Sequence, residues 1–210
     1  MEQAGSGLRV SAGDAAATAN AILAHESSFH LGFALGLISI ACYVVVTALF
    51  YQLFKPVSTS LSLTATLLSL VGIAIWACAS LFQLAALILL KGNVYLSVFN
   101  MNQLQALALM FLNLNNQAYS IGVVFEGLFW IPIGYLIFRS TFLPRVLGVL
   151  FAIAGFGYLT FLSPPLITYL LPYIGILGTL AEISIILWLL VKGVNAQRWK
   201  EQAGAADMRI

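Results

Sequence analysis

Charged residues are scarce in this 210-residue sequence: 8% of the residues are Asp, Glu, Lys or Arg, whereas 61% are hydrophobic. Four long stretches carry no charge at all, and they are residues 31–54, 56–90, 92–125 and 146–181. A soluble domain of this size needs a polar face on most of its helices, which these stretches do not provide. Because about 20 mostly apolar residues cross a bilayer core, the sequence predicts an integral membrane protein.

Residues and motifs that carry chemistry are also few. The only cysteines are Cys42 and Cys78, each inside an apolar stretch, and neither a CxxC nor a Cys/His metal spacing is present. We therefore expect two buried thiols that pack as small hydrophobic side chains. Glycine-rich phosphate loops, HExxH and GxSxG are absent, so we expect no enzyme activity and no cofactor. The net charge of +2 gives no indication of nucleic-acid binding.

The apolar pattern predicts an all-α membrane protein, a compact bundle of about five transmembrane helices. The expected spans are residues 30–54, 60–90, 116–138, 144–163 and 172–192. Proline ends the first span at Lys55-Pro56, and Ser58 offers a cap for the second. The segment PPLITYLLP, residues 164–172, is expected to be a short hairpin connection between the last two spans.

Two further helical segments, residues 14–28 and 101–115, are expected to be short interfacial helices. The first is too short and polar to cross a membrane. The second, fused to the third span, would reach about 57 Å at the α-helical rise, against a hydrocarbon core of about 30 Å. It should therefore lie along the interface or project beyond it. We expect residues 1–12 to be a flexible N-terminus, 13–200 a single membrane-embedded domain, and 201–210 a flexible cytoplasmic tail.

Two carboxylates fall inside predicted spans. Glu126 lies 13 residues before Arg139 and Glu182 lies 10 residues before Lys192, which places both near mid-depth, within about 5 Å of one level. No Lys, Arg or Asp lies at that depth, so each acid should face the bundle interior and be protonated or hydrogen-bonded. The expected partners are Ser, Thr, Tyr, Gln and backbone carbonyls. A structural polar contact and a proton or cation site are the two interpretations.

Weaker candidates lie where the third span begins. These side chains belong to an amide-rich segment and are Asn113, Asn116, Gln117 and Tyr119. Hydrogen bonding to water and lipid headgroups explains the amides more simply than a ligand vestibule does. His25 and His30 are five residues apart, which does not place them on one helical face for metal ligation. The pattern Gly32-xxx-Gly36 allows close helix packing, and we favour internal packing over dimerisation.

Four segments resemble a known family: GDAAATANAILAHESSFHLG (13–32), YLSVFNMNQLQALALMFLNLN (95–115), GYLIFRSTFLPRVLGVL (134–150) and LWLLVKGVN (187–195). Together they resemble the bacterial integral membrane family called domain of unknown function 4386. The resemblance implies a compact helical membrane bundle and implies no activity. Members carry acidic and histidine side chains where this sequence has Asn113, Asn115 and Asn116, so the resemblance implies no ionisable role there.

Members of that family also carry another apolar helix before the GDAAAT segment. Here only twelve residues precede Gly13, and they contain no long apolar run. We therefore expect either an upstream coding extension or a partner protein that supplies this first transmembrane helix.

The leading functional hypothesis is a non-enzymatic structural or accessory protein that binds lipid, an apolar ligand or partner helices. Its expected partners are the lipid bilayer and a membrane-protein partner or a second copy in a homo-oligomer. The alternative is a small proton-coupled transporter or channel component that uses Glu126 and Glu182 within an oligomer. An enzyme that acts on lipid is a third hypothesis. The expected location is the bacterial cytoplasmic membrane.

Lys and Arg are distributed unequally between the two ends of the predicted spans. One side carries seven of them: Lys55, Arg139, Arg145, Lys192, Arg198, Lys200 and Arg209. The other side carries Arg9 and Lys91. The positive-inside rule places the C-terminus in the cytoplasm.

This orientation predicts that a reporter fused after Arg209 is cytoplasmic. It also predicts that a cysteine introduced at Ser97 reacts with a membrane-impermeant thiol reagent in intact cells, because Ser97 would lie outside. Labelling of that cysteine only after lysis would show that the assigned orientation is wrong.

Overall fold

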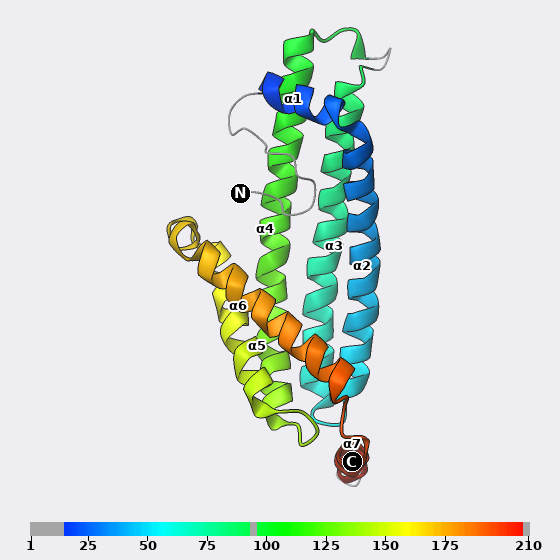
Figure 1. Cartoon of the computed structure of the whole chain (residues 1–210), viewed down its shortest axis with the longest axis vertical. Coiled ribbons are helices and arrows are strands. Elements are labelled where there is room, and N and C mark those ends of the chain that lie inside the picture. Colours follow the sequence, from blue (N-terminus) through cyan, green and yellow to red (C-terminus); the bar gives the residue numbers. More distant parts are fainter. Residues whose placement is uncertain (1–14, 93–95, 208–210) are drawn as a thin grey trace. The chain divides into compact units, whose positions relative to one another are not determined.

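A computed structural model of the chain describes residues 15–92 and 96–207, and every element in these ranges is a helix (Figure 1). The elements are α1 (Ala15–Ala24), α2 (Glu26–Phe54), α3 (Thr59–Leu90), α4 (Met101–Arg139), α5 (Arg145–Tyr158), η2 (Leu159–Leu162), α6 (Pro164–Val191) and α7 (Ala196–Asp207). Five segments are long and apolar enough to cross a membrane: α2, α3, α4, α5 with η2, and α6. The prediction of an all-α membrane protein with five spans is confirmed, and the chain is a polytopic membrane protein.

Local side-chain and glycine signals set the helix ends. The Ser58 hydroxyl accepts a hydrogen bond from the Leu61 N–H and caps α3. At the start of α4, the side chains of Asn100 and Gln103 each accept a hydrogen bond from the other residue's backbone N–H, at 2.9 Å. This reciprocal pair satisfies two N–H groups that helix geometry leaves without partners. After α3, Gly92 has φ 64°, a conformation that costs other residues energy.

The third span is longer than the sequence predicted. Residues 101–115 are not a separate short interfacial helix, because they form the first turns of α4, which continues for 39 residues to Arg139. The run Asn115-Asn116-Gln117 does not interrupt the helix, since it contains neither Pro nor Gly. The Asn115 side chain donates to the Ala79 carbonyl on α3 at 2.8 Å rather than to its own local backbone.

Three other boundaries differ from the predictions. The helix expected over residues 14–28 ends at Ala24, and residues 26–28 begin α2 instead. The segment expected to be a hairpin connection is helical, since α6 begins at Pro164; proline is well tolerated in a first helical turn because that turn's N–H groups have no intrahelical partner. Residues 201–207 of the expected tail belong to α7, whereas residues 1–12 lie outside the described residues.

Contacts divide the chain into two compact units. Unit 1 comprises Met1–Tyr43 and Ala74–Tyr119, and unit 2 comprises Val44–Ile73 and Ser120–Ile210. The helices α2, α3 and α4 each contribute residues to both units. That residues 13–200 form one domain stays a prediction.

In unit 1, α1 lies across neighbouring turns of the longer helices (Figure 1). Its buried residues Ala19 and Ile22 join a core to which α2, α3 and α4 contribute Phe29, Ala86, Leu87, Leu90, Ala108 and Leu112. The small alanines of α3 and α4 are fully or almost fully buried, so α1 can approach closely although it is short and has only a weakly amphipathic sequence.

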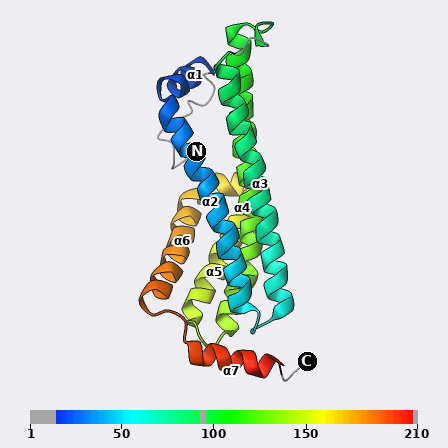
Figure 2. The ribbon, with the colours of Figure 1, turned by 90° about the vertical axis from the view of Figure 1, so that its right-hand side faces the viewer.

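In unit 2, α5 and α6 pack beside α4, and α7 lies across the end of these helices (Figure 2). The core is largely aromatic and aliphatic, built around Trp130, Ile133, Leu136 and Ile137 of α4. Phe151 and Ala154 of α5 and Ala181 and Ile185 of α6 complete it.

Backbone contact between α4 and α5 depends on glycine. A Cβ atom added at Gly148 would lie 2.5 Å from the Gly134 carbonyl oxygen, and one added at Gly127 would lie 2.8 Å from the Gly155 carbonyl oxygen. Both approaches involve backbone atoms, which cannot move aside as a flexible side chain would. Such small-residue contacts are typical of helix packing in membranes, where close van der Waals packing replaces the hydrophobic effect.

Two packing predictions are wrong. Cys42 and Cys78 are exposed rather than buried, because the helices α2 and α3 that carry them are apolar on all sides and their sequences do not indicate which face is inside. Internal packing was expected at Gly36, but a Cβ added there would meet nothing within 4 Å.

The glycine contacts predict that Gly148→Ala lowers the thermal stability of the protein in detergent by about 1–3 kcal/mol, since the added methyl group forces the α4 and α5 backbones apart. Gly175→Ala on α6 is the matched control, because a Cβ added there meets nothing within 4 Å, and replacing a helical glycine by alanine is otherwise mildly stabilising. Equal melting temperatures for the two variants would contradict the assigned contact.

Candidate functional site

Among the Asp, Glu, Lys and Arg residues that the structure describes, Glu126 is the most deeply buried, with 3% of its surface exposed. The turn of α4 that carries it is closed in by glycine contacts on two sides. A Cβ at Gly72 of α3 would lie 3.7 Å from the Glu126 backbone nitrogen, and Gly127 packs against α5. The carboxyl group therefore lies inside unit 2 and not on its lipid-facing surface.

One oxygen of the Glu126 carboxyl group has a defined partner. The indole Nε1–H of Trp130, one helical turn further along α4, donates a hydrogen bond to Oε1 at 2.9 Å. Tryptophan was not among the partners expected from the sequence, so that part of the prediction was incomplete. The spacing of four residues could have indicated the pair, because side chains at i and i+4 lie on the same helical face.

The other oxygen is different. Glu126 Oε2 is buried and has no hydrogen-bond partner among the described residues. Glu182 of α6, a half-buried side chain, lies within electrostatic range of Glu126. None of the ion pairs formed by described residues includes Glu126. A buried carboxylate without a cation is costly, whereas a neutral carboxyl group accounts for the arrangement.

Aromatic rings extend from Glu126 to α6, the helix that carries Glu182. The Trp130 ring stacks on Phe151 of α5, with centroids 4.6 Å apart, and meets the edge of Tyr158 at 5.0 Å. The Tyr158 hydroxyl packs directly against Gly178 of α6, one turn before Glu182. Glu126, Trp130, Tyr158 and Glu182 are called the carboxyl site below.

The two acids of the carboxyl site have the chemistry of proton binding. Two acids close enough to interact electrostatically disfavour double ionisation, so the pair is suited to sharing a proton. Among the described residues, no group of three or more His, Cys, Asp or Glu side chains could hold a metal ion.

The weaker candidates belong to unit 1. Asn113 and Gln117 are exposed and Asn116 is half-buried. Tyr119 is 52% exposed and stacks on Trp76, whose indole N–H donates to the Tyr119 carbonyl at 3.1 Å.

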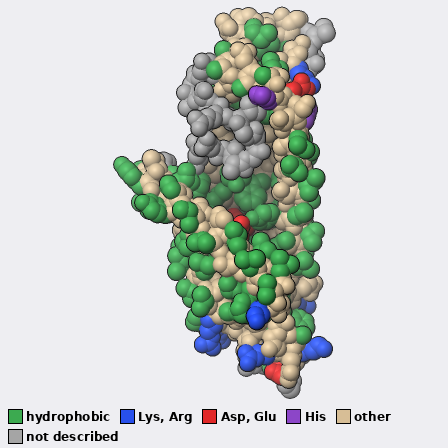
Figure 3. All heavy atoms as spheres, in the orientation of Figure 1, with side chains coloured by type: hydrophobic (Ala, Val, Ile, Leu, Met, Phe, Trp, Pro, Cys, Tyr) green, Lys and Arg blue, Asp and Glu red, His purple; other side chains and the backbone are tan. Residues whose placement is uncertain are grey.

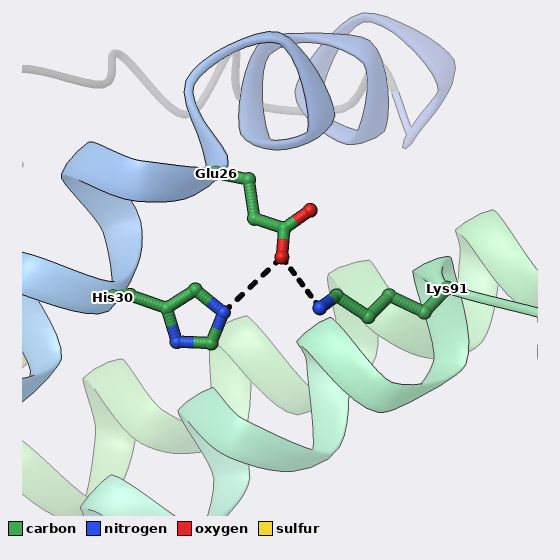
Figure 4. Close-up of polar contacts among 3 residues, drawn as sticks. All are labelled: Glu26, His30 and Lys91. Carbon is green, nitrogen blue, oxygen red and sulfur yellow. Dashed lines mark hydrogen bonds and ion pairs between the residues drawn. The ribbon is translucent and has the colours of Figure 1, made fainter.

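A polar cluster that the sequence analysis missed lies in unit 1 (Figure 4). The Glu26 carboxylate at the start of α2 accepts a hydrogen bond from His30 Nε2 at 3.2 Å and forms an ion pair with Lys91, which follows α3. All three side chains are substantially exposed, so the cluster contributes little stability. The spacing of four residues between Glu26 and His30 was the signal available in the sequence.

Comparison with known proteins gives one match. The family described as Domain of unknown function (DUF4386) matches residues 4–193, which is most of the 210-residue chain. This confirms the resemblance found in the sequence. No curated protein and no solved structure matches the chain.

The geometry of the carboxyl site predicts that Glu126→Gln leaves thermal stability in detergent within about 1 kcal/mol of the unmodified protein, because the amide oxygen can still accept from Trp130. Glu126→Lys should prevent assembly, since it places a cation in the core of unit 2. A Glu126→Gln protein that fails to fold would mean that the ionised carboxylate is required, and would contradict the neutral assignment.

Proposed function

We propose a role for this chain from the premise that it belongs to the family described as Domain of unknown function (DUF4386). In our proposal it is a non-enzymatic accessory protein of the bacterial cytoplasmic membrane with its C-terminus in the cytoplasm. It acts by packing against a transmembrane helix of a partner protein or of a second copy. The main support for this proposal is that few residues of α2 are buried by the rest of the described chain.

The α2 helix has few internal contacts for a helix of its length. In its most apolar 18-residue window only 6% of the residues are buried, against 56% in α4. Lipid alone can cover an apolar helix, so exposure by itself does not indicate a partner. The position of Gly36 adds a more specific argument.

Gly36 lies on the same face of α2 as Phe29, which is two turns earlier and 5% exposed. At Phe29 this face is packed, whereas at Gly36 a Cβ would meet nothing within 4 Å. Gly32 and Gly36 form a small-xxx-small pattern, which allows the backbone of a second helix to approach closely. Since no described residue uses this approach at Gly36, it is available to a helix from outside the chain.

A second candidate function is supported by the carboxyl site. The unpartnered Oε2 atom of Glu126 and the nearby Glu182 favour a proton-coupled transporter or channel component, since acids within a membrane are functional candidates. The Glu126→Gln protein tests it in liposomes: loss of proton flux with unchanged stability favours transport, and equal flux in both proteins counts against it.

The partner-helix proposal predicts that a photo-crosslinking amino acid at Ile40 forms a protein adduct in native membranes. Side chains in helices lean toward the N-terminus, so a probe at Ile40 covers the surface beside Gly36. Gly36→Leu should abolish the adduct, because the leucine blocks the close approach of a second helix. It should not change the thermal stability of the isolated chain, because the leucine enters open space there. An adduct of twice 22.7 kDa would identify a second copy.

Gly175→Leu serves as the matched control, because Gly175 on α6 also has open space around a Cβ position. The adduct should persist in this variant. Absence of any protein adduct at Ile40, or an adduct equally strong in Gly36→Leu, would refute the proposed packing surface.

A further inference from the structure

A shallow apolar groove lies in unit 2, where the end of α2 meets the segment between α6 and α7. Its volume is about 330 Å³, and it is lined by Leu49, Gln52, Leu53, Val194, Ala196 and Trp199. Five of these six side chains are apolar. The groove is open on one side, as a site for an elongated ligand that enters from the membrane would be.

Basic residues adjoin both walls of this groove. Lys55 follows Leu53 by two residues, Lys192 precedes Val194 by two, and Arg198 is next to Trp199. All three side chains are exposed, and none forms an ion pair with an acid among the described residues. Figure 3 shows Lys and Arg side chains gathered at this end of unit 2, next to the hydrophobic surface of α5 and α6.

Hydrogen bonds fix α7 in place and thereby give the groove a defined wall. The Trp199 indole N–H donates to the Leu53 carbonyl at 2.9 Å. The Gln202 side-chain oxygen accepts from both the N–H and the hydroxyl of Thr141, each at 3.1 Å. Arg198 Nη1 donates to the Thr141 carbonyl at 3.3 Å. These contacts tie α7 to the end of α2 and to the α4–α5 connection, so Trp199 and its neighbour Arg198 are held at the groove.

We propose that this groove binds one anionic glycerophospholipid. An acyl chain lies against Leu49, Leu53 and Trp199, and the phosphate faces Lys55, Lys192 and Arg198. Apolar contact and positive charge meet here on neighbouring residues, and this combination fits the two chemically different parts of such a lipid. The proposal goes beyond the proposed function, since it uses neither Gly36 nor the carboxyl site.

The test is native mass spectrometry of the full chain, released from nanodiscs of equal parts phosphatidylglycerol and phosphatidylcholine. The unmodified protein should retain one phosphatidylglycerol in preference to phosphatidylcholine. The double variant Lys192→Gln/Arg198→Gln should retain about tenfold less, because each basic residue near a membrane surface contributes to anionic-lipid binding. The matched control is Arg139→Gln/Arg145→Gln, which removes the same charge from residues that do not line or adjoin the groove, and it should retain the lipid.

A second pair of variants tests the acyl-chain contact without changing charge. Ala196→Phe fills the groove and should lower phosphatidylglycerol retention, whereas Ala205→Phe, on an exposed part of the same helix, should not. Thermal stability measured in parallel identifies a variant that loses lipid only because it unfolds. The proposal would be overturned if phosphatidylglycerol retention fell only in variants that lose thermal stability, whether or not the substituted residue lines the groove.

Three other outcomes would also overturn it. Equal loss in both double variants would mean a general electrostatic surface without a site. Equal retention of the two lipids would mean that charge plays no part. Displacement of the lipid by glycerol phosphate or inorganic phosphate at equal concentration would mean an anion site that needs no acyl chain. The Ile40 crosslink tests the partner-helix proposal separately, and either proposal can fail without the other.

Discussion

Direct backbone contact between α4 and α5 is the constraint on which unit 2 depends. At the Gly134–Gly148 and Gly127–Gly155 contacts no side chain separates the two helices. This close approach sets the distance at which Trp130 reaches Phe151 and Tyr158, and thus the enclosure of Glu126. Without water to compensate for imperfect packing, a membrane bundle relies on van der Waals contact of this kind. Glu126 can lie this deep in the core because the four residues at these contacts are glycines, which have no side chain to hold the helices apart.

The same environment explains how Glu126 is accommodated. Its Oε1 atom is satisfied by Trp130 and its Oε2 atom is not satisfied by a described residue. In a low-dielectric core an incompletely satisfied polar group is costly, so the Oε2 atom lowers the stability of unit 2. The groove beside α7 represents the opposite solution, because its lining is mostly apolar and the charged side chains near it in sequence remain exposed.

The sequence predicted the features that depend on local composition. Five apolar runs became five spans, and Ser58 capped α3 as expected. It did not predict which face of each helix is buried, because α2 and α3 are apolar on all sides; Cys42 and Cys78 were misplaced for that reason. The start of α6 was also missed, since proline was interpreted as a break although it occupied a first turn. At the site, the depth of Glu126 was predictable, whereas Tyr158 and Gly178 depend on packing between helices distant in sequence.

The hydrogen bonds of α7 have a consequence for biosynthesis. The Leu53 carbonyl receives its donor from Trp199, 146 residues later in the chain, and Thr141 likewise receives its partner from Gln202. Since chains are made from the N-terminus at about 5–20 residues per second, the Leu53 carbonyl and Thr141 stay without these partners until the last segment leaves the ribosome. The C-terminal helix thus completes contacts at the end of α2 and between α4 and α5 at once, and a chain truncated before residue 196 would leave these two positions without their final partners.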